Sequence, residues 1–353
     1  MNDRRFTFLK TFTALTLLFQ LVACSHKALI DDNDQSVVDI AREYAVLEIP
    51  LPDEISLSAF EYSGLGWFGD ILVLLPQYPN RNSGGHSGLL YGIKKDDLIK
   101  WKNDPSQELV FFDIPFDDVG FSRSLPEFEG FEAILFIDQD VYLTIETSAG
   151  NPMKSFLVRG SVLSNGEDGF AISLDKKQII ELPQQNRSSN ASYEALTSDG
   201  EFIYALYEQY GQCVNEHPYA LKINRQLSVI EEIPVDPINY RVTDASQIDK
   251  NGEFWAVNYF YSGDVHLKVE VDPISDRFGL PGSHEFGERV ERLVKFRLNF
   301  QNIEVLYETP LYLELLANED ARNWEGLVVL DENTFVIVTD KFPKSILGMV
   351  IIE

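Results

Sequence analysis

Short apolar runs separated by turn residues dominate this chain, and one pair of runs recurs along it. In the segment 194–208, Ala195 and Leu196 begin an apolar run, Asp199-Gly200 forms a turn signal, and residues 202–207 form a second run rich in aromatic side chains. The segment 244–258 has the same form around an Asn-Gly dipeptide. Such segments predict tight β-hairpins, so the first and last residues of each lie at the same end.

Five segments share this form. Each begins with a polar residue followed by Gly or Ala, and each closes on another polar residue 14 positions later, or 15 in the last segment. The starting residues are Ser63, Glu132, Glu194, Asp244 and Glu325. The closing residues are Gln77, Glu146, Glu208, Asn258 and Asp340. A repeated unit of this kind predicts the architecture of the whole chain.

The strands that follow the hairpins indicate a β-propeller. Two further apolar runs follow each of the first four hairpins, which gives the four strands of a propeller blade. Only one run, 346–352, follows the fifth hairpin, and the segment 44–49 supplies the missing strand. We therefore predict an all-β, five-bladed propeller over residues 41–353, with its ring closed by an N-terminal strand. An insertion at about 263–290 leaves a six-bladed ring as the alternative.

The N-terminal region predicts export. Residues 1–23 combine a basic start with a short apolar stretch, as in a secretory signal peptide. Their ending, Leu21-Val22-Ala23-Cys24, resembles the bacterial lipoprotein signal. That resemblance implies lipidation of Cys24 and attachment to a membrane surface, which in a Gram-negative cell would be the outer membrane. Residues 24–40 are mostly polar and predict a flexible tether between the lipid and the propeller.

The charge of the chain excludes some partners. There are 56 acidic and 29 basic residues, a net charge of −27. This surface repels nucleic acid and anionic lipid headgroups, so we expect no nucleic-acid partner and membrane contact only through the lipid anchor. The sequence contains no Gly-x-Ser-x-Gly elbow, no P-loop and no His-Glu-x-x-His motif.

The five starting residues predict a metal site. The first strand of a propeller blade is the innermost, so these residues should converge at the mouth of the central channel. Carboxylates crowded there must either take up protons or bind a cation. Oxygen ligands select a hard cation, and Ca²⁺ accepts loose coordination more readily than Mg²⁺. We predict Ca²⁺ bound by Ser63, Glu132, Glu194, Asp244 and Glu325. The alternative is that they are ordinary polar residues that accept backbone N–H groups.

Basic residues near the same face predict an anionic ligand. Four arginines each precede a starting residue by three to nine positions, and a fifth follows the first hairpin; they are Arg123, Arg187, Arg241, Arg322 and Arg81. Lys341 follows the last hairpin. Arginine suits bidentate recognition of phosphate or carboxylate, so we predict an anionic small molecule at this rim. Alternatively, these arginines pair with neighbouring carboxylates.

Short motifs carry a resemblance to known propeller families. The segments Asn323-Trp-Glu-Gly-Leu with Val338-Thr-Asp340, and Phe131-Glu-Ala-Ile with Ile145-Glu146, resemble the bacterial phytase-like family, also called esterase-like. The series of starting residues also resembles the five-bladed calcium-activated nucleotidases, or apyrases, which hold one Ca²⁺ on the propeller axis. That resemblance implies Ser63, Glu132, Glu194 and Glu325 as metal ligands.

This chain departs from the nucleotidases at two points. The fourth starting position is Asp244, or Ser246 two residues later, where they have Ser. The segment 75–81 also replaces their acidic, Arg-containing phosphate-binding stretch.

These patterns lead to one main expectation and one rival. We expect a lipid-anchored, calcium-binding propeller that, if it is an enzyme, hydrolyses phosphoesters, with Glu146, Glu208 or Asp340 as the general base. The rival is a non-catalytic propeller with a structural ion, whose face binds a protein or a glycan.

Overall fold

The computed structural model describes residues 40–352 except 82–87, 149–152, 165–168, 189, 286–287 and 319–320. The predicted signal peptide, Cys24 and nearly all of the predicted tether lie outside the described residues, so the lipid anchor stays a prediction. In the described part, none of the helices has the length and apolar character that crossing a membrane requires.

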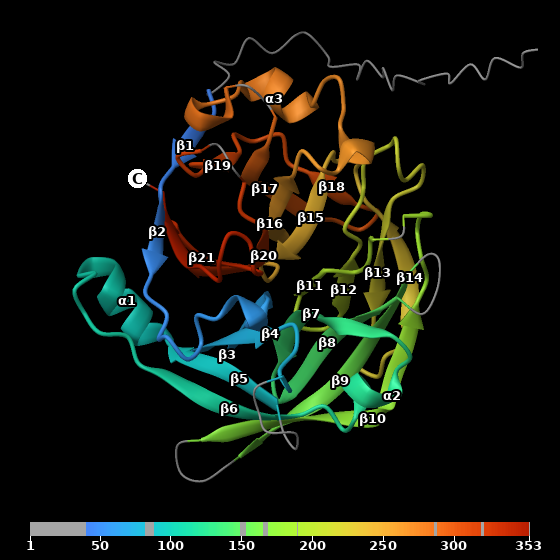
Figure 1. The fold of residues 1–353 in the computed structure, drawn as a ribbon. Helices are drawn as coiled ribbons and strands as arrows, with labels where there is room; N and C mark the ends of the chain where they lie inside the picture. Colours follow the sequence, from blue (N-terminus) through green and yellow to red (C-terminus); the bar gives the residue numbers. More distant parts are fainter. Residues whose placement is uncertain are drawn as a thin grey trace, which may run out of the picture.

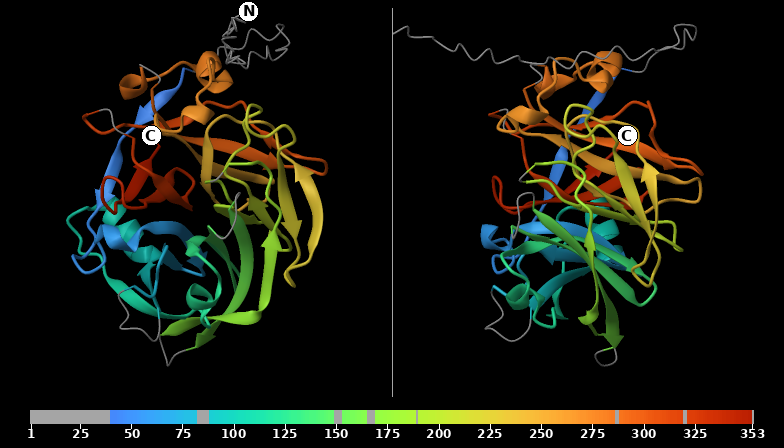
Figure 2. Two further views of the ribbon diagram at one scale, coloured as in Figure 1. Left: turned by 45° about the vertical axis from the view of Figure 1, so that its right-hand side comes forward. Right: turned by 90° about the vertical axis from the view of Figure 1, so that its right-hand side faces the viewer.

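The described strands form sheets that radiate from a central axis (Figures 1 and 2). The first sheet runs outwards through β3 (Tyr62–Phe68), β4 (Ile71–Pro76), β5 (Gly88–Lys94) and β6 (Phe111–Asp117). The second contains β7 (Phe128–Ile137), β8 (Asp140–Thr147), β9 (Lys154–Ser164) and β10 (Phe170–Leu182). The third contains β11 (Ala195–Ser198), β12 (Ile203–Leu206), β13 (Tyr219–Ile223) and β14 (Val229–Pro234).

The fourth and fifth sheets include strands from the N-terminus. The fourth contains β15 (Arg241–Ala245), β16 (Glu253–Phe260) and β17 (Val290–Leu298), with β18 (Ile303–Val305) and β19 (Leu311–Leu313) both paired to β17. Strand β1 (Arg42–Tyr44) joins β19 in parallel. The fifth contains β20 (Trp324–Asp331), β21 (Thr334–Thr339), β22 (Leu347–Ile351) and the N-terminal β2 (Val46–Ile49).

The inner strands complete a ring. Strands β3, β7, β11, β15 and β20 each contact the next, and β20 contacts β3. The prediction of an all-β propeller is therefore confirmed. The predicted closure is also confirmed, because β2 pairs antiparallel with β22 and brings Val46 opposite Val350. One feature is unexpected: β10 pairs in parallel with β6, which joins the first two sheets into one of eight strands.

The predicted insertion forms helices. It contains η2 (Val265–Leu267), α3 (Pro273–Phe278) and η3 (Gly282–His284), and its described residues form no strand before β17. They therefore contribute nothing to the extra sheet of the six-bladed alternative. Elsewhere lie the short η1 (Ser58–Phe60), α1 (Lys95–Asn103) and α2 (Phe121–Ser124).

A buried ion pair anchors the insertion to the fourth sheet. Arg292 on β17 is fully buried and donates hydrogen bonds to Asp272 at 2.6 Å and to Asn258 at 2.8 Å. Asp272 also accepts a hydrogen bond from the Ser275 amide and so caps α3. Separating this pair would leave an uncompensated buried charge, which is costly. The pair therefore holds the insertion in one position against the fourth sheet, although the insertion forms no strand of its own.

Four of the five starting residues lie at irregularities in the inner strands, whereas Glu194 directly precedes β11. In β3, Tyr62 lies opposite Pro76 and Gly64 opposite Leu75, so Ser63 has no partner in the register. The register skips Glu132 in β7 and Glu325 in β20 in the same way, and β15 is irregular across Asp244. A bulge adds one residue to one strand and redirects its side chain. In four of the five sheets the sequence repeat therefore marks an irregularity of the inner strand at the axis.

Gly326, which follows the bulge in β20, packs closely against two sheets. A Cβ atom at Gly326 would lie 2.6 Å from Val338 Cγ1 and 2.9 Å from Leu65 Cγ. These contacts involve side chains of both the same sheet and the neighbouring one, so this position leaves no room for a larger residue.

We expect Gly326→Ala to lower the free energy of unfolding by about 1–3 kcal/mol, because overpacking forces side chains or backbone to shift. The matched control is Gly211→Ala, where an added Cβ meets no atom nearer than 3.6 Å. Urea denaturation of both variants measures the difference. Equal stability of the two variants would contradict the packing argument.

Candidate functional site

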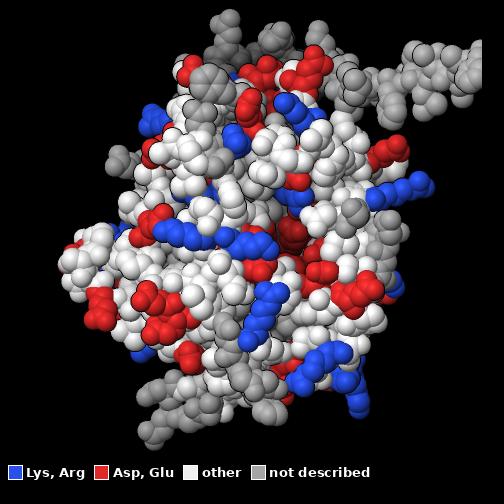
Figure 3. All heavy atoms as spheres, viewed as in Figure 1, with Lys and Arg blue, Asp and Glu red and all other residues white. Residues whose placement is uncertain are grey.

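An acidic cavity of about 480 Å³ opens at one end of the propeller axis. In the surface view, acidic side chains gather in a central hollow (Figure 3). The carboxylate residues that line the cavity are Glu61, Glu132, Glu146, Glu194, Asp264, Glu325 and Asp340. Two basic residues also line it, Arg241 and Lys341. The ends of the hairpins therefore meet at one concave site, as their common direction predicts.

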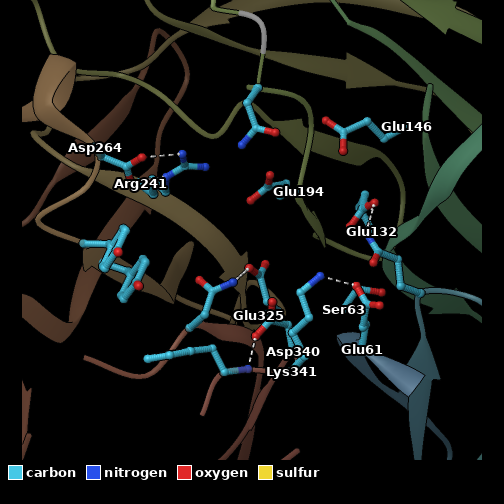
Figure 4. A pocket seen from close by; sticks show the side chains of 16 residues that line it. Glu61, Ser63, Glu132, Glu146, Glu194, Arg241, Asp264, Glu325, Asp340 and Lys341 are labelled. Atoms are coloured by element: carbon cyan, nitrogen blue, oxygen red, sulfur yellow. Dashed lines mark hydrogen bonds and ion pairs between the residues drawn. The ribbon is translucent and has the colours of Figure 1, made fainter. Parts of the chain in front are cut away.

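Four of the five predicted metal ligands line this cavity: Ser63, Glu132, Glu194 and Glu325 (Figure 4). Asp244 does not. Its buried carboxylate accepts hydrogen bonds from the amides of Leu327 at 2.7 Å and Ala245 at 2.8 Å. Asp244 thus ties β15 to β20, which is the backbone-accepting role that we gave as the alternative.

The closing residues divide into three roles. Gln77 donates a hydrogen bond to Glu132 Oε1 at 2.8 Å and so holds a starting residue in place. Glu146 and Asp340 line the cavity, whereas Glu208 lies outside its lining, fully buried and ion-paired with Arg241. Asn258 bonds to the buried Arg292 instead.

Burial and mutual repulsion raise the pKa values of the cavity carboxyls. Burial, and then the charges of neighbouring carboxylates, raise the pKa of Glu132 and of Glu325 well above the usual range. Burial raises the pKa of Glu194 to about 8 even though Arg241 opposes the shift. Burial likewise raises the pKa of Glu146 to about 7. Several of these groups therefore carry protons near neutral pH when nothing else offsets their charge.

Glu194 carries an unsatisfied oxygen. Its Oε2 is buried and has no hydrogen-bond partner in the described structure, although the residue lines the cavity. A buried polar atom without a partner costs free energy, so it is a natural acceptor for a ligand. Among the described residues, however, no group of three or more His, Cys, Asp or Glu side chains stands close enough to hold a metal ion.

Most of the predicted ligand-binding arginines do not reach the cavity. Arg241 alone among them lines it, and Asp264 and Glu208 already pair with its guanidinium. Arg322 is buried against Glu291 at 2.9 Å. The alternative reading, pairing with neighbouring carboxylates, therefore describes both arginines.

The three remaining arginines lie outside the lining. Arg81 pairs with Glu61 at 2.9 Å and lies over the ring of Tyr78. Arg123 and Arg187 are exposed. Nearness to a hairpin in the sequence therefore does not place these three side chains in the cavity.

Sequence reasoning missed several lining residues, among them Glu61, Asp264, Tyr259, Tyr261 and Phe342. Glu61 lies two positions before Ser63, so its proximity to the site was visible in the pattern. Tyr261 directly follows β16, and Asp264 belongs to the start of the insertion, whose path depends on the buried Arg292–Asp272 pair. No short-range pattern in the sequence predicts that ion pair, whose members are 20 residues apart.

Comparisons with known proteins add little to this description. No known family model and no curated protein sequence matches the chain. Three solved structures illustrate the distant likenesses that exist. The soluble aldose sugar dehydrogenase of Escherichia coli is 10% identical with a TM-score of 0.42, over 86% of this chain and 98% of that one.

The other two are carbohydrate-active proteins. The catalytic domain of a Coprinopsis cinerea GH62 α-L-arabinofuranosidase is 9% identical with a TM-score of 0.43, over 89% of this chain and 97% of that one. An exo-β-1,3-galactanase described for Bifidobacterium bifidum is 10% identical with a TM-score of 0.44, over 88% and 94%. These likenesses are too distant to bear on the activity of this chain. Its own sheets define it as a β-propeller protein with an acidic axial cavity.

The raised pKa of Glu194 predicts an unusual pH dependence of stability. A carboxyl whose pKa rises from 4.5 to about 8 on folding stabilises the fold while it is protonated. That contribution is lost as the pH rises through this window. With chelator present, Glu194→Gln should therefore raise the melting temperature at pH 8 by about 4 °C or more, and by much less at pH 5.

Thermal melts from pH 5 to pH 8 measure this difference. The control is Glu332→Gln, an exposed carboxylate at the other end of the same hairpin as Glu325. If the wild type and Glu194→Gln show the same pH dependence, the Glu194 carboxyl is not the strained group described here.

Proposed function

We propose that the axial cavity binds a Ca²⁺ ion through Glu132, Glu194 and Glu325, with the hydroxyl of Ser63 as a further oxygen ligand. The observation that carries this proposal is the convergence of three glutamates, from three different sheets, on one cavity. None of the three forms an ion pair with a described Lys or Arg. Carboxylate and hydroxyl oxygens are the ligands that a hard cation prefers.

The donor set fits Ca²⁺ better than Mg²⁺. The side chains as they stand are too far apart to hold an ion together. Cation binding therefore requires the glutamates to move towards one another. Ca²⁺ accepts six to eight ligands with variable geometry, whereas Mg²⁺ demands a near-ideal octahedron. The unpartnered Oε2 of Glu194 supports such a movement, because this oxygen has no hydrogen bond to lose and would gain a contact with the cation.

We further propose phosphoester hydrolysis as the reaction at this site, in line with the phytase-like resemblance. A cation held here would polarise a phosphoryl oxygen and lower the pKa of a water molecule. Lys341 lines the cavity and would contact the anionic ligand from its exposed position, while it keeps its ion pair with Glu61. Arg241 can do so only in part, because Asp264 holds its Nε and Nη2 at 2.7 and 2.9 Å.

Glu146 is the best-placed candidate for the general base. It lines the cavity, whereas Glu208 is buried behind Arg241. Asp340 also lines the cavity, but its Oδ1 accepts a hydrogen bond from the Phe342 amide at 2.7 Å and so holds a turn together. A base must reach the attacking water, which leaves Glu146 the freer of the two carboxylates.

Glu194→Gln and Glu325→Gln should each weaken Ca²⁺ binding at least about 10-fold, because affinity follows the charge of the ligands. Isothermal titration calorimetry on chelator-treated protein measures this. Glu332→Gln is the control and should bind as the wild type does. Ca²⁺ binding that is unchanged in both glutamate variants would exclude this cavity as the site.

Glu146→Gln should lower kcat for an aryl phosphate by about 10²–10⁴-fold, while weakening Ca²⁺ less than Glu194→Gln does. Steady-state kinetics with Ca²⁺ present, on a panel of phosphate monoesters and nucleotides, measures the effect. Ca²⁺ binding with no hydrolysis of any substrate would instead support the rival reading, a structural ion in a non-catalytic propeller.

A further inference from the structure

The charges of the cavity do not balance. Both of its basic residues already have carboxylate partners: Asp264 binds Arg241, and Glu61 binds Lys341 at 2.6 Å. The remaining lining carboxylates form no ion pair with a described Lys or Arg; they are Glu132, Glu146, Glu194, Glu325 and Asp340. The cavity therefore has an excess of acidic groups over basic ones, which favours positively charged ligands.

Aromatic side chains form another part of the wall. Tyr259 and Tyr261, at the end of β16, and Phe342, after β21, all line the cavity. Tyr261 is 47% exposed and Phe342 is 46% exposed, so both rings remain available to a ligand. Large aromatic rings are more often buried than these two are. Beside an acidic cavity, their faces can attract a cation through cation–π interactions.

Short turns fix the backbone that carries both exposed rings. The Asp264 amide donates to the Tyr261 carbonyl at 2.9 Å, and the Phe342 amide donates to Asp340 Oδ1 at 2.7 Å. Asp264 also pairs with Arg241, which fixes the turn to β15. Because the backbone is already fixed, a ligand has only the side-chain rotations of the two rings to order.

We infer that this cavity binds an organic ammonium ion. An ammonium group is attracted both by the unpaired carboxylates and by the negative face of an aromatic ring, whereas a neutral molecule of the same shape gains neither attraction. The buried, unpartnered Oε2 of Glu194 offers a further acceptor in the same cavity. The volume of about 480 Å³ accommodates a small alkylammonium head.

This inference does not rest on the proposed Ca²⁺ site. It rests on the sign of the cavity and on the position of the rings. The two cations are nevertheless linked, because an ammonium group that reached Glu194 or Glu325 would compete with the metal for the same oxygens.

The test compares choline with 3,3-dimethylbutan-1-ol, which has the same shape but carries carbon in place of the charged nitrogen. Calorimetry on the full chain, treated with chelator, should show choline binding at least about 10-fold more tightly than the neutral alcohol. Phe342→Leu keeps an apolar side chain but removes the ring, so it should weaken choline about two- to fivefold. Glu194→Gln should weaken choline as well.

The control variant is Phe300→Leu, since Phe300 is a fully exposed ring that does not line the cavity. It should bind choline as the wild type does, and melting temperatures confirm that each variant folds. Equal binding of choline and the alcohol, no binding of either, or no effect of Phe342→Leu would overturn the inference.

Repeating the titrations with Ca²⁺ separates the two proposals. Choline binding in a protein that does not bind Ca²⁺ would sink the metal proposal and support this one. Ca²⁺ binding without choline binding would do the reverse. Weaker choline binding in the presence of Ca²⁺ supports a shared set of carboxylates.

Discussion

The close approach of the inner strands at the axis is the constraint on which the rest of this structure depends. The strands β3, β7, β11, β15 and β20 touch one another around the ring, and at Gly326 even an added Cβ would lie 2.6 Å from Val338. Ser63, Glu132 and Glu325 have no partner in the register, and they line the same cavity as Glu194, which directly precedes β11. The inner strands thus pack closely along the axis, and their irregularities direct polar side chains to the mouth of the channel.

Concentrating carboxylates in this way costs stability. Their pKa values rise because burial and repulsion both disfavour the charged forms. A fold that needed these residues only for packing would be more stable with neutral amides in their place. Perturbed carboxyls gathered in one cavity are characteristic of functional sites, where the strain is relieved by a ligand. The proposals of a cationic ligand therefore rest on these same perturbed carboxyls.

Local patterns predicted the sheets well and the side-chain contacts poorly. The hairpin repeat identified the inner strands, and the missing strand in the last unit led correctly to β2. The roles predicted for Asp244 and for most of the arginines differ from the contacts that these side chains make in the structure. Asp244 shares the spacing of its counterparts, but the irregularity in β15 spans two residues, and its carboxylate meets the Leu327 amide. Charge and spacing alone cannot distinguish a cavity ligand from a residue that ties two strands together.

The sequence by itself determined the repeat, the number of polar positions at the axis and the need for small residues beside them. These features are set by hydrophobic alternation and turn residues, which act over a few positions. Only the tertiary structure decided which charges remain unpaired. The partners of Arg241, Arg322 and Lys341 are Asp264, Glu291 and Glu61, each brought close by folding and not by spacing within a hairpin. The interaction between two charges depends on their distance in the folded chain. For that reason only the tertiary structure shows which acidic residues of the cavity have a basic partner.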